Sequence, residues 1–138
     1  SHYLLKPNSF IYGICLGMQL LFEKSFEFGS TKGLGLIKGN IPELQKKNKK
    51  MKTNMGWCKT KFLQKSNKLD FQNFNNKHFY FVHSYYANPA NNKDILAKTF
   101  HGNFEFTSVV KRNNILGTQF HPEKSGNLGI EFLRNLKK

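Results

Sequence analysis

A short segment near the start of the chain, Gly13-Ile-Cys-Leu-Gly17, most limits what this sequence can fold into. The run from Ser9 to Ile14 before it is mostly apolar and is typical of a buried strand. From Leu16 to Phe22 the apolar residues recur at helical spacing, so we expect a helix there. A strand that passes into a helix within one residue must reverse sharply, which small neighbours permit. The segment therefore predicts a strand–turn–helix unit, with Cys15 in a strained conformation at the turn.

Cys15 is a candidate nucleophile. A thiol at a helix N-terminus faces backbone N–H groups and the positive end of the helix dipole, which favour the thiolate. The N–H of Leu16 would be free to donate to the oxyanion that forms on attack. The alternative is an inert buried cysteine beside two turn glycines, because free cysteine often packs as a small hydrophobe. The five residues alone leave both interpretations open.

A second candidate group, His121-Pro-Glu123, follows the run from Ile115 to Phe120. Proline disfavours the helical region for the residue before it, so we expect His121 to be extended. Side chains two apart on an extended chain face the same side, which would let Glu123 reach the imidazole. A carboxylate there selects the tautomer and stabilises the imidazolium. The alternative, a strand-ending proline between two surface polar residues, loses ground beside Cys15, because such Cys and His residues meet in space rather than in sequence.

Strand-forming residues dominate the second half of the chain. We expect strands over Phe79–Val82 and Ile95–Phe100. We also expect a hairpin from Thr107–Val110 to Ile115–Phe120, connected through residues 111–114 because Asn tolerates positive φ.

The remaining segments are less regular. Leu34 to Ile41 is expected to form a short strand interrupted at Gly39, whereas Gly29–Gly35 and Pro42–Asn54 are expected to be loops. The chain should end in a helix over Leu128–Leu136, with Ile130, Leu133 and Leu136 as its apolar positions.

Composition excludes several classes of function. The formal net charge is +14, but its lysines are spread among many Asn residues, and the one cluster, residues 46–52, is expected to be a solvated loop. No nucleic-acid-binding motif accompanies it, so no nucleic-acid partner is expected. The two cysteines form neither a CxxC pair nor a Cys/His metal spacing, and we expect no metal or cofactor. A length of 138 residues fits one domain, and the lack of a long apolar stretch predicts no membrane segment and a cytoplasmic protein.

Five stretches of the sequence carry a resemblance to a known family. They are Gly13-Ile-Cys-Leu-Gly-Met-Gln-Leu-Leu-Phe22, Lys32-Gly-Leu-Gly-Leu-Ile37, Met55-Gly-Trp57, Phe79-Tyr-Phe-Val-His-Ser-Tyr-Tyr86 and Gly117-Thr-Gln-Phe-His-Pro-Glu-Lys-Ser125. They span almost the whole chain in the family's order. Through them the chain resembles the class I (triad) glutamine amidotransferases, and most closely the glutaminase subunits of imidazole glycerol phosphate synthase. The resemblance implies an α/β, flavodoxin-like fold, with a mixed or parallel sheet flanked by helices.

The resemblance also implies the roles of individual residues. Cys15 attacks the side-chain amide of glutamine, His121 moves the proton, and Glu123 holds His121. Gln19 and Glu27 match family positions that hold the substrate, and the backbone around Ser84 and Tyr85 should line the same pocket.

For the ammonia product, the resemblance implies a sheltered path to a partner. In this family the partner is a (β/α)₈-barrel cyclase subunit, which forms a heterodimer with the glutaminase and makes imidazole glycerol phosphate and an aminoimidazole carboxamide ribotide in histidine biosynthesis. Trp57 matches a position near that interface, although a lone Trp is equally often part of a core. Two alternatives stay open: a paralogous amidotransferase for surface-sugar modification, and a truncated, non-catalytic remnant or binding module that keeps the motif without activity.

The chain departs from the family pattern before Cys15. A Pro-Gly-x-Gly loop that supplies part of the family's oxyanion hole does not occur in the sequence, so we expect a domain without its N-terminal portion and with weak turnover on its own. Cys58 follows Met55-Gly-Trp57, where the family commonly has Asn, and is interpreted as structural. No chemistry is assigned to His83, because a His at the end of an aromatic strand is more often packed and hydrogen-bonded.

Overall fold

The computed structural model describes residues 9–27, 29–47, 49–50, 52–63 and 70–137. Its larger sheet has six strands, and its smaller sheet has four. The order across the larger sheet is β1 (Ile11–Ile14), β10 (Ile115–Thr118), β9 (Phe104–Arg112), β8 (Ile95–His101), β5 (Asn54–Phe62) and β6 (Lys77–His83). The order across the smaller sheet is β3 (Thr31–Lys32), β2 (Phe22–Ser25), β4 (Ile37–Ile41) and β7 (Asn88–Pro89).

Both sheets are mixed. The pairs β1–β10 and β2–β4 are parallel, and the other neighbouring pairs of described strands are antiparallel. The helices are short: α1 (Leu16–Leu20), α2 (Leu44–Lys47) and α3 (Gly126–Asn135), with single 3₁₀ turns at η2 (Gln72–Phe74), η3 (Asn92–Asp94) and η4 (Pro122–Lys124). The structure thus has the predicted α/β class and mixed sheet, although most of its pairing is antiparallel.

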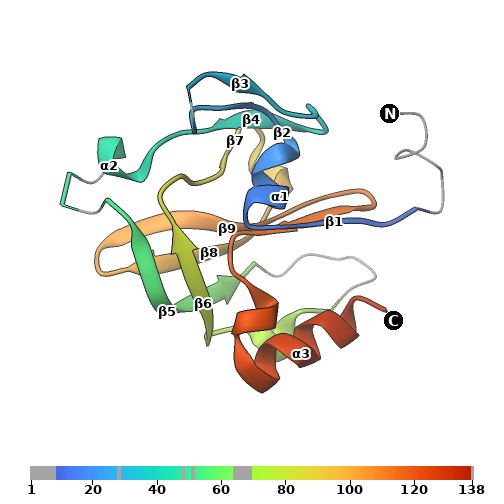
Figure 1. Ribbon diagram of the computed structural model, residues 1–138. Helices are drawn as coiled ribbons and strands as arrows, with labels where there is room; N and C mark the ends of the chain where they lie inside the picture. The colour runs from blue at the N-terminus through green and yellow to red at the C-terminus, as the bar shows by residue number, and fades with distance from the viewer. Residues whose placement is uncertain (1–8, 28, 48, 51, 64–69, 138) are drawn as a thin grey trace.

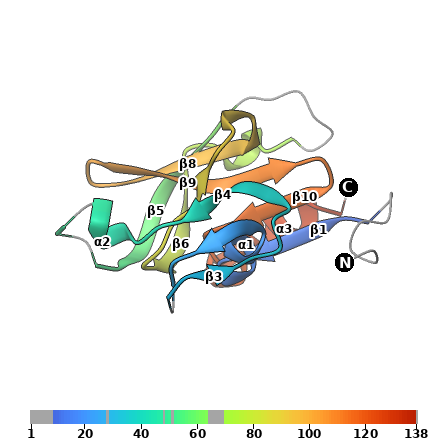
Figure 2. The same ribbon diagram turned by 90° about the horizontal axis from the view of Figure 1, so that it is seen from above.

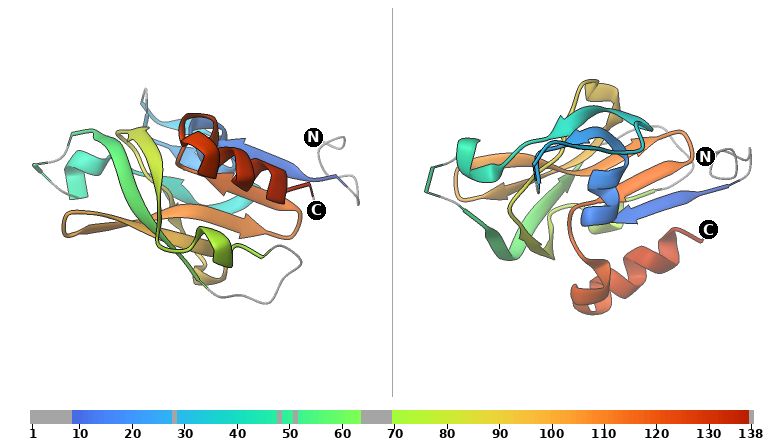
Figure 3. Two further views of the ribbon diagram at one scale, coloured as in Figure 1. Left: turned by 90° about the horizontal axis from the view of Figure 1, so that it is seen from below. Right: turned by 45° about the horizontal axis from the view of Figure 1, so that its top comes forward.

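The larger sheet lies between two layers (Figures 1 and 2). Helix α1 and the smaller sheet cover one face, and α3 covers the other. The view from below in Figure 3 shows α3 lying across the β1–β10 side of the sheet, where Phe132 packs near Tyr12.

Each face has its own apolar cluster, because successive residues of a strand point to opposite faces. On β10, for example, Ile115 joins the cluster under α1, and Leu116 joins the cluster under α3. The cluster under α3 is rich in aromatic side chains and centres on Phe132, which is fully buried and contacts several other rings.

Several sequence predictions are confirmed. Strands form at β1, β6 and β8, and β9 and β10 form the predicted hairpin. At the hairpin turn Asn113 has φ of 52°, the left-handed conformation that its residue type tolerates.

Three predicted boundaries are wrong. Helix α1 ends at Leu20 rather than Phe22, because Phe22 pairs with Ile37 as the first residue of β2. The predicted loop over Pro42–Asn54 contains α2 and the first residue of β5; within it Asn48 and Met51 lie outside the described residues. The predicted loop over Gly29–Gly35 contains the two residues of β3.

The apolar face of the last helix also differs from the prediction. Ile130 is 47% exposed, whereas Gly129 and Phe132 are buried, with Leu128 and Leu136 packed beside Phe132. The helix therefore turns a Leu128–Phe132–Leu136 stripe to the sheet, at the four-residue spacing of a helix face.

Candidate active site

The backbone at Cys15 adopts the strained conformation that the sequence predicts. Its φ is 53° and its ψ is −107°, and it joins β1 directly to α1. A Cβ atom on Gly13 would lie 2.6 Å from the backbone of Gly17, so only glycine allows α1 to approach β1 this closely. A Cβ atom on Gly17 would meet nothing within 4 Å, so Gly17 is not needed for space, contrary to expectation.

His121 and Glu123 reach the same edge of the sheet as Cys15. Strands β1 and β10 are parallel neighbours, with Ile14 opposite Thr118, and the N–H of Cys15 donates to the carbonyl of Thr118 at 2.7 Å. The carboxyl ends of parallel strands meet at one edge, so the chain that follows β10 begins beside the Cys15 turn.

The predicted contact between His121 and Glu123 is present. Nδ1 of His121 lies 2.9 Å from Oε2 of Glu123. We expected an extended backbone from His121 through Glu123. His121 is extended, but the backbone enters the 3₁₀ turn η4 at Pro122. Two bonds hold His121 there: its N–H donates to the carbonyl of Tyr80, and its carbonyl accepts from Oγ of Ser125.

The sulfur of Cys15 lies in a polar but partly buried environment. It is 3.9 Å from the carbonyl oxygen of Val82, and the side-chain amide of Gln119 donates to it at 3.5 Å. Burial raises the pKa of the Cys15 thiol, opposed by hydrogen bonds from the Leu16 N–H and Gln119, and the carboxylates of Glu27 and Glu123 raise it further. The structure therefore does not show the expected preference of Cys15 for its thiolate form. The helix that begins at Leu16 has only five residues, and its N-terminal N–H groups offset only part of the effect of burial on the pKa.

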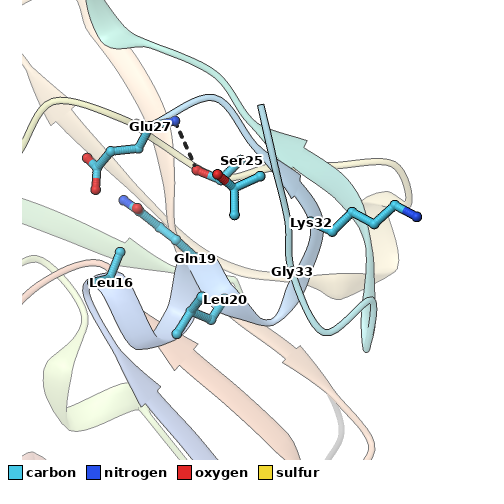
Figure 4. Close-up of a pocket in the computed structure, with 8 residues that line it drawn as sticks. Leu16, Gln19, Leu20, Ser25, Glu27, Lys32 and Gly33 are labelled. Atoms are coloured by element: carbon cyan, nitrogen blue, oxygen red, sulfur yellow. Dashed lines mark hydrogen bonds between the residues drawn. The ribbon is translucent and has the colours of Figure 1, made fainter. Parts of the chain in front are cut away.

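A pocket of about 200 Å³ opens beside the turn. Its lining includes Leu16, Gln19 and Glu27. Figure 4 shows the side chains of Gln19 and Glu27 directed toward each other at one end of the pocket, whereas Lys32 points away. The Oε1 atom of Gln19 is buried and lacks a hydrogen-bond partner among the described residues.

Ser84 and Tyr85 occupy different environments. The carbonyl of Tyr85 accepts from Nε2 of Gln19 at 3.5 Å, which brings this backbone to the predicted substrate-binding residues. The polar groups of Ser84 face elsewhere: its hydroxyl bonds the hydroxyl of Thr53, and its carbonyl accepts from the N–H of Leu44. The structure thus brings Tyr85, but not the described polar atoms of Ser84, to Gln19.

Sequence reasoning missed Gln119 as a residue of the site. It is fully buried and contacts both Cys15 and Gln19. The available signal was a long polar side chain between Thr118 and Phe120, at the end of a strand that is expected to be buried, since buried amides need partners.

The other residues singled out from the sequence lie outside this contact set. Cys58 is buried on β5 and contacts Asn54 and His101, as a structural residue would. Trp57 is 54% exposed and packs edge-on against Tyr80, so it is not part of the core.

Within the described ranges there is no group of His, Cys, Asp or Glu that could hold a metal ion, and no helix with the length and apolar character to span a lipid bilayer.

A strained cysteine between a strand and a helix, with a histidine–carboxylate pair in the segment that follows the parallel neighbouring strand, defines a class of protein. The family model of the class-I glutamine amidotransferases matches residues 2–137, and the chain belongs to this family. Among curated relatives, imidazole glycerol phosphate synthase subunit HisH of Sulfurimonas denitrificans is 47% identical over 93% of this chain and 62% of its own length. HisH of Methanocaldococcus jannaschii is 46% identical over 89% of this chain and 60% of its own length.

Solved structures agree on the fold. PurLQS from Thermotoga maritima matches with a TM-score of 0.70 and 19% identity, over 99% of this chain and 64% of that one. A crystal structure of a glutamine amidotransferase matches with a TM-score of 0.59 and 15% identity, over 92% of this chain and 60% of that one. The chain thus spans about three-fifths of the relatives' length.

Proposed function

We propose that this chain carries the catalytic triad of a glutaminase, Cys15, His121 and Glu123, and that it hydrolyses glutamine to glutamate and ammonia. The observation that supports this most strongly is the placement of Cys15 and of the His121–Glu123 pair after two parallel neighbouring strands. Membership of the class-I glutamine amidotransferases supports the same reaction.

The proposed reaction has two halves. His121 takes the thiol proton as the sulfur attacks the side-chain amide carbon, and the N–H of Leu16 donates to the oxyanion. The C–N bond then breaks, and His121 gives the proton to the departing ammonia. In the second half water attacks the thioester with His121 as base, glutamate leaves, and the thiol is restored. Glu123 fixes the Nδ1–H tautomer of His121, which leaves Nε2 to exchange the proton.

The pocket beside the turn suits the rest of the substrate. The α-ammonium of glutamine needs an acceptor, and the Glu27 carboxylate lines the pocket opposite Gln19. In this proposal the Tyr85 carbonyl holds Gln19 in place, whereas the hydroxyl and the carbonyl of Ser84 bond to Thr53 and Leu44 and take no part in binding.

We further propose that the ammonia passes to the (β/α)₈-barrel cyclase subunit that the family resemblance implies; the HisH relatives are named as subunits of imidazole glycerol phosphate synthase, which supports a partner subunit. Ammonia released into water is protonated and loses its nucleophilic lone pair, so a bound partner protects it. Met55 and Trp57, on β5 at 63% and 54% exposure, form an apolar surface suited to such a partner.

The two free cysteines agree with a reducing cytoplasmic compartment.

The test is glutamate release from glutamine by this chain, measured with and without the cyclase subunit. Cys15→Ala should abolish release, and His121→Asn should lower it by roughly 10²–10⁴-fold, the usual contribution of a general base. His78→Asn is the matched control, because His78 is an exposed histidine on β6 and should leave the rate unchanged. Equal release by Cys15→Ala and by the unaltered chain would refute the proposal.

A further inference from the structure

We propose that Gln119 is a positioning residue of this site, whose side-chain amide holds the sulfur of Cys15 by a hydrogen bond and stabilises it as a thiolate. The inference rests on the proposed function in taking Cys15 as the nucleophile. It adds a residue outside the triad that acts on that nucleophile directly.

Gln119 is held rigidly at the turn. It follows β10, its side chain is fully buried, and its backbone N–H donates to the carbonyl of Ser108 at 2.8 Å. Because β10 is the parallel neighbour of β1, the Gln119 amide reaches the Cys15 sulfur at 3.5 Å. Burial of Gln119 excludes water as a competing partner for its amide, whereas the Cys15 sulfur is only partly buried.

The hydrogen-bond network fixes which end of the Gln119 amide faces the sulfur. A backbone carbonyl can only accept, and the carbonyl of Tyr85 faces Nε2 of Gln19 at 3.5 Å, so that atom must be the NH₂ group. The same NH₂ group donates to Oε1 of Gln119 at 3.4 Å. Gln119 therefore presents its own NH₂ group, and not its oxygen, to Cys15.

A buried histidine anchors the same carbonyl. Nδ1 of His83 donates to the Tyr85 carbonyl at 2.7 Å, which leaves Nε2 to accept from the amide of Asn54 at 3.0 Å. His83 is thus neutral with its proton on Nδ1, and burial lowers its pKa to about 4. The Tyr85 carbonyl thus accepts from both His83 and Gln19, and through Gln19 and Gln119 the network reaches the nucleophile.

Stabilisation of the thiolate is needed because most of the other neighbours oppose it. The carbonyl of Val82 can accept only from the protonated thiol, and it repels a thiolate. The carboxylates of Glu27, after β2, and Glu123, in η4, are negatively charged and also disfavour a thiolate at Cys15. The described donors to the sulfur are the Leu16 N–H and Gln119, and a hydrogen bond to a charged acceptor is stronger than one to a neutral group.

The test is the pH dependence of Cys15 alkylation by iodoacetamide, measured without glutamine and read on the Cys15 peptide by mass spectrometry. Only the thiolate reacts, so the midpoint of the rate profile reports its ionisation. Gln119→Met removes the donor at nearly constant volume and should raise the midpoint by about one pH unit, or slow alkylation about tenfold below it. Gln119→Glu should raise the midpoint further, because it places a like charge on the sulfur.

The control for a merely structural role is Thr60→Val. It removes the buried Thr60–Thr99 hydrogen bond, at 2.8 Å, from β5 and β8. Its midpoint should stay at that of the unaltered chain. If Gln119→Met does not fold, Gln119→Asn, whose amide is one methylene short of the sulfur, should give the same upward shift.

An unchanged midpoint in the folded Gln119 variant would overturn the proposal, as would an equal shift in Thr60→Val. Because no glutamine is present, failure here is distinct from failure of the glutaminase proposal, which glutamate release decides.

Discussion

At the scale of single residues, the site places a cysteine where its proton is hard to remove. Burial raises the pKa of Cys15, and the two nearby carboxylates act in the same direction. The left-handed backbone conformation aims the sulfur at the sheet edge, where His121 and Gln119 follow β10. The proposed chemistry therefore depends on hydrogen-bond donors and a base brought to Cys15, rather than on an intrinsically acidic thiol.

His83 makes a separate, titratable contribution to stability. Its pKa of about 4 lies below its ordinary value of 6.5, chiefly because it is buried, so the folded state takes up its proton less readily than the unfolded state. Above about pH 6.5 His83 is neutral in both states and costs no stability. As the pH falls from 6.5 toward 4, the unfolded state binds the proton first, and the free energy of unfolding falls by at most about 3 kcal/mol. Urea unfolding at a series of pH values measures it.

The matched variant is His83→Asn, whose amide nitrogen replaces Nδ1 as the donor to Tyr85 and does not titrate. Its free energy of unfolding should fall less between pH 6.5 and 4 than that of the unaltered chain. Parallel pH dependences in the two proteins would show that His83 is not the group responsible.

At the scale of elements, the strand–turn–helix unit and the strand before His121 could be predicted from the sequence. Their residue types leave few alternatives: glycines flank the turn, and Asn113 and Asn114 separate two apolar runs. Strand β5 could not be predicted as readily, because Asn54 is buried whereas Met55 and Trp57 are exposed, so its apolar residues do not mark its buried face. The end of α1 was hidden too, since apolar residues continue from the helix into β2.

The close approach of α1 to β1 gives a sharp test of the turn. Gly13→Ala should destabilise the chain by about 3 kcal/mol, because its Cβ atom would lie 2.6 Å from backbone atoms that cannot move aside. Gly17→Ala is the matched control: its Cβ atom has open space and favours the helix, so it should be neutral or stabilise by up to about 1 kcal/mol. Thermal unfolding of both variants measures the difference, and equal effects would contradict the proposed packing of the turn.

At the scale of the whole molecule, the larger sheet separates two clusters with different tasks. The aromatic cluster around Phe132 anchors α3 beneath the sheet, and the cluster around Met18 fixes α1 above it. The sequence carried the family's motifs in order, but the site also needs contacts between distant segments, such as Gln19 with Gln119 and Tyr85. Those contacts depend on sheet order and register, which residue periodicity does not specify.

The exposed side of β5 gives a prediction about the partner. Trp57→Ala should weaken binding of the proposed cyclase partner about tenfold or more, because large exposed aromatics often dominate interfaces. Its effect on the stability of the isolated chain should be below about 1 kcal/mol, since it removes one exposed aromatic contact with Tyr80. Titration calorimetry measures the affinity. Phe100→Ala, an aromatic on β8 that is 43% exposed, is the control, and equal losses in both variants would argue against an interface at Trp57.

The most direct test of the central claim, that Cys15 is the nucleophile for glutamine, is covalent labelling by a glutamine analogue with a diazoketone in place of its side-chain amide. A thiol that attacks the analogue loses its proton to it, and the adduct forms with release of dinitrogen. Mass spectrometry should find the adduct on Cys15 and not on buried Cys58, glutamine should slow its formation, and His121→Asn should slow it further. Labelling of both cysteines alike, or labelling of Cys15 that glutamine does not slow, would contradict the account.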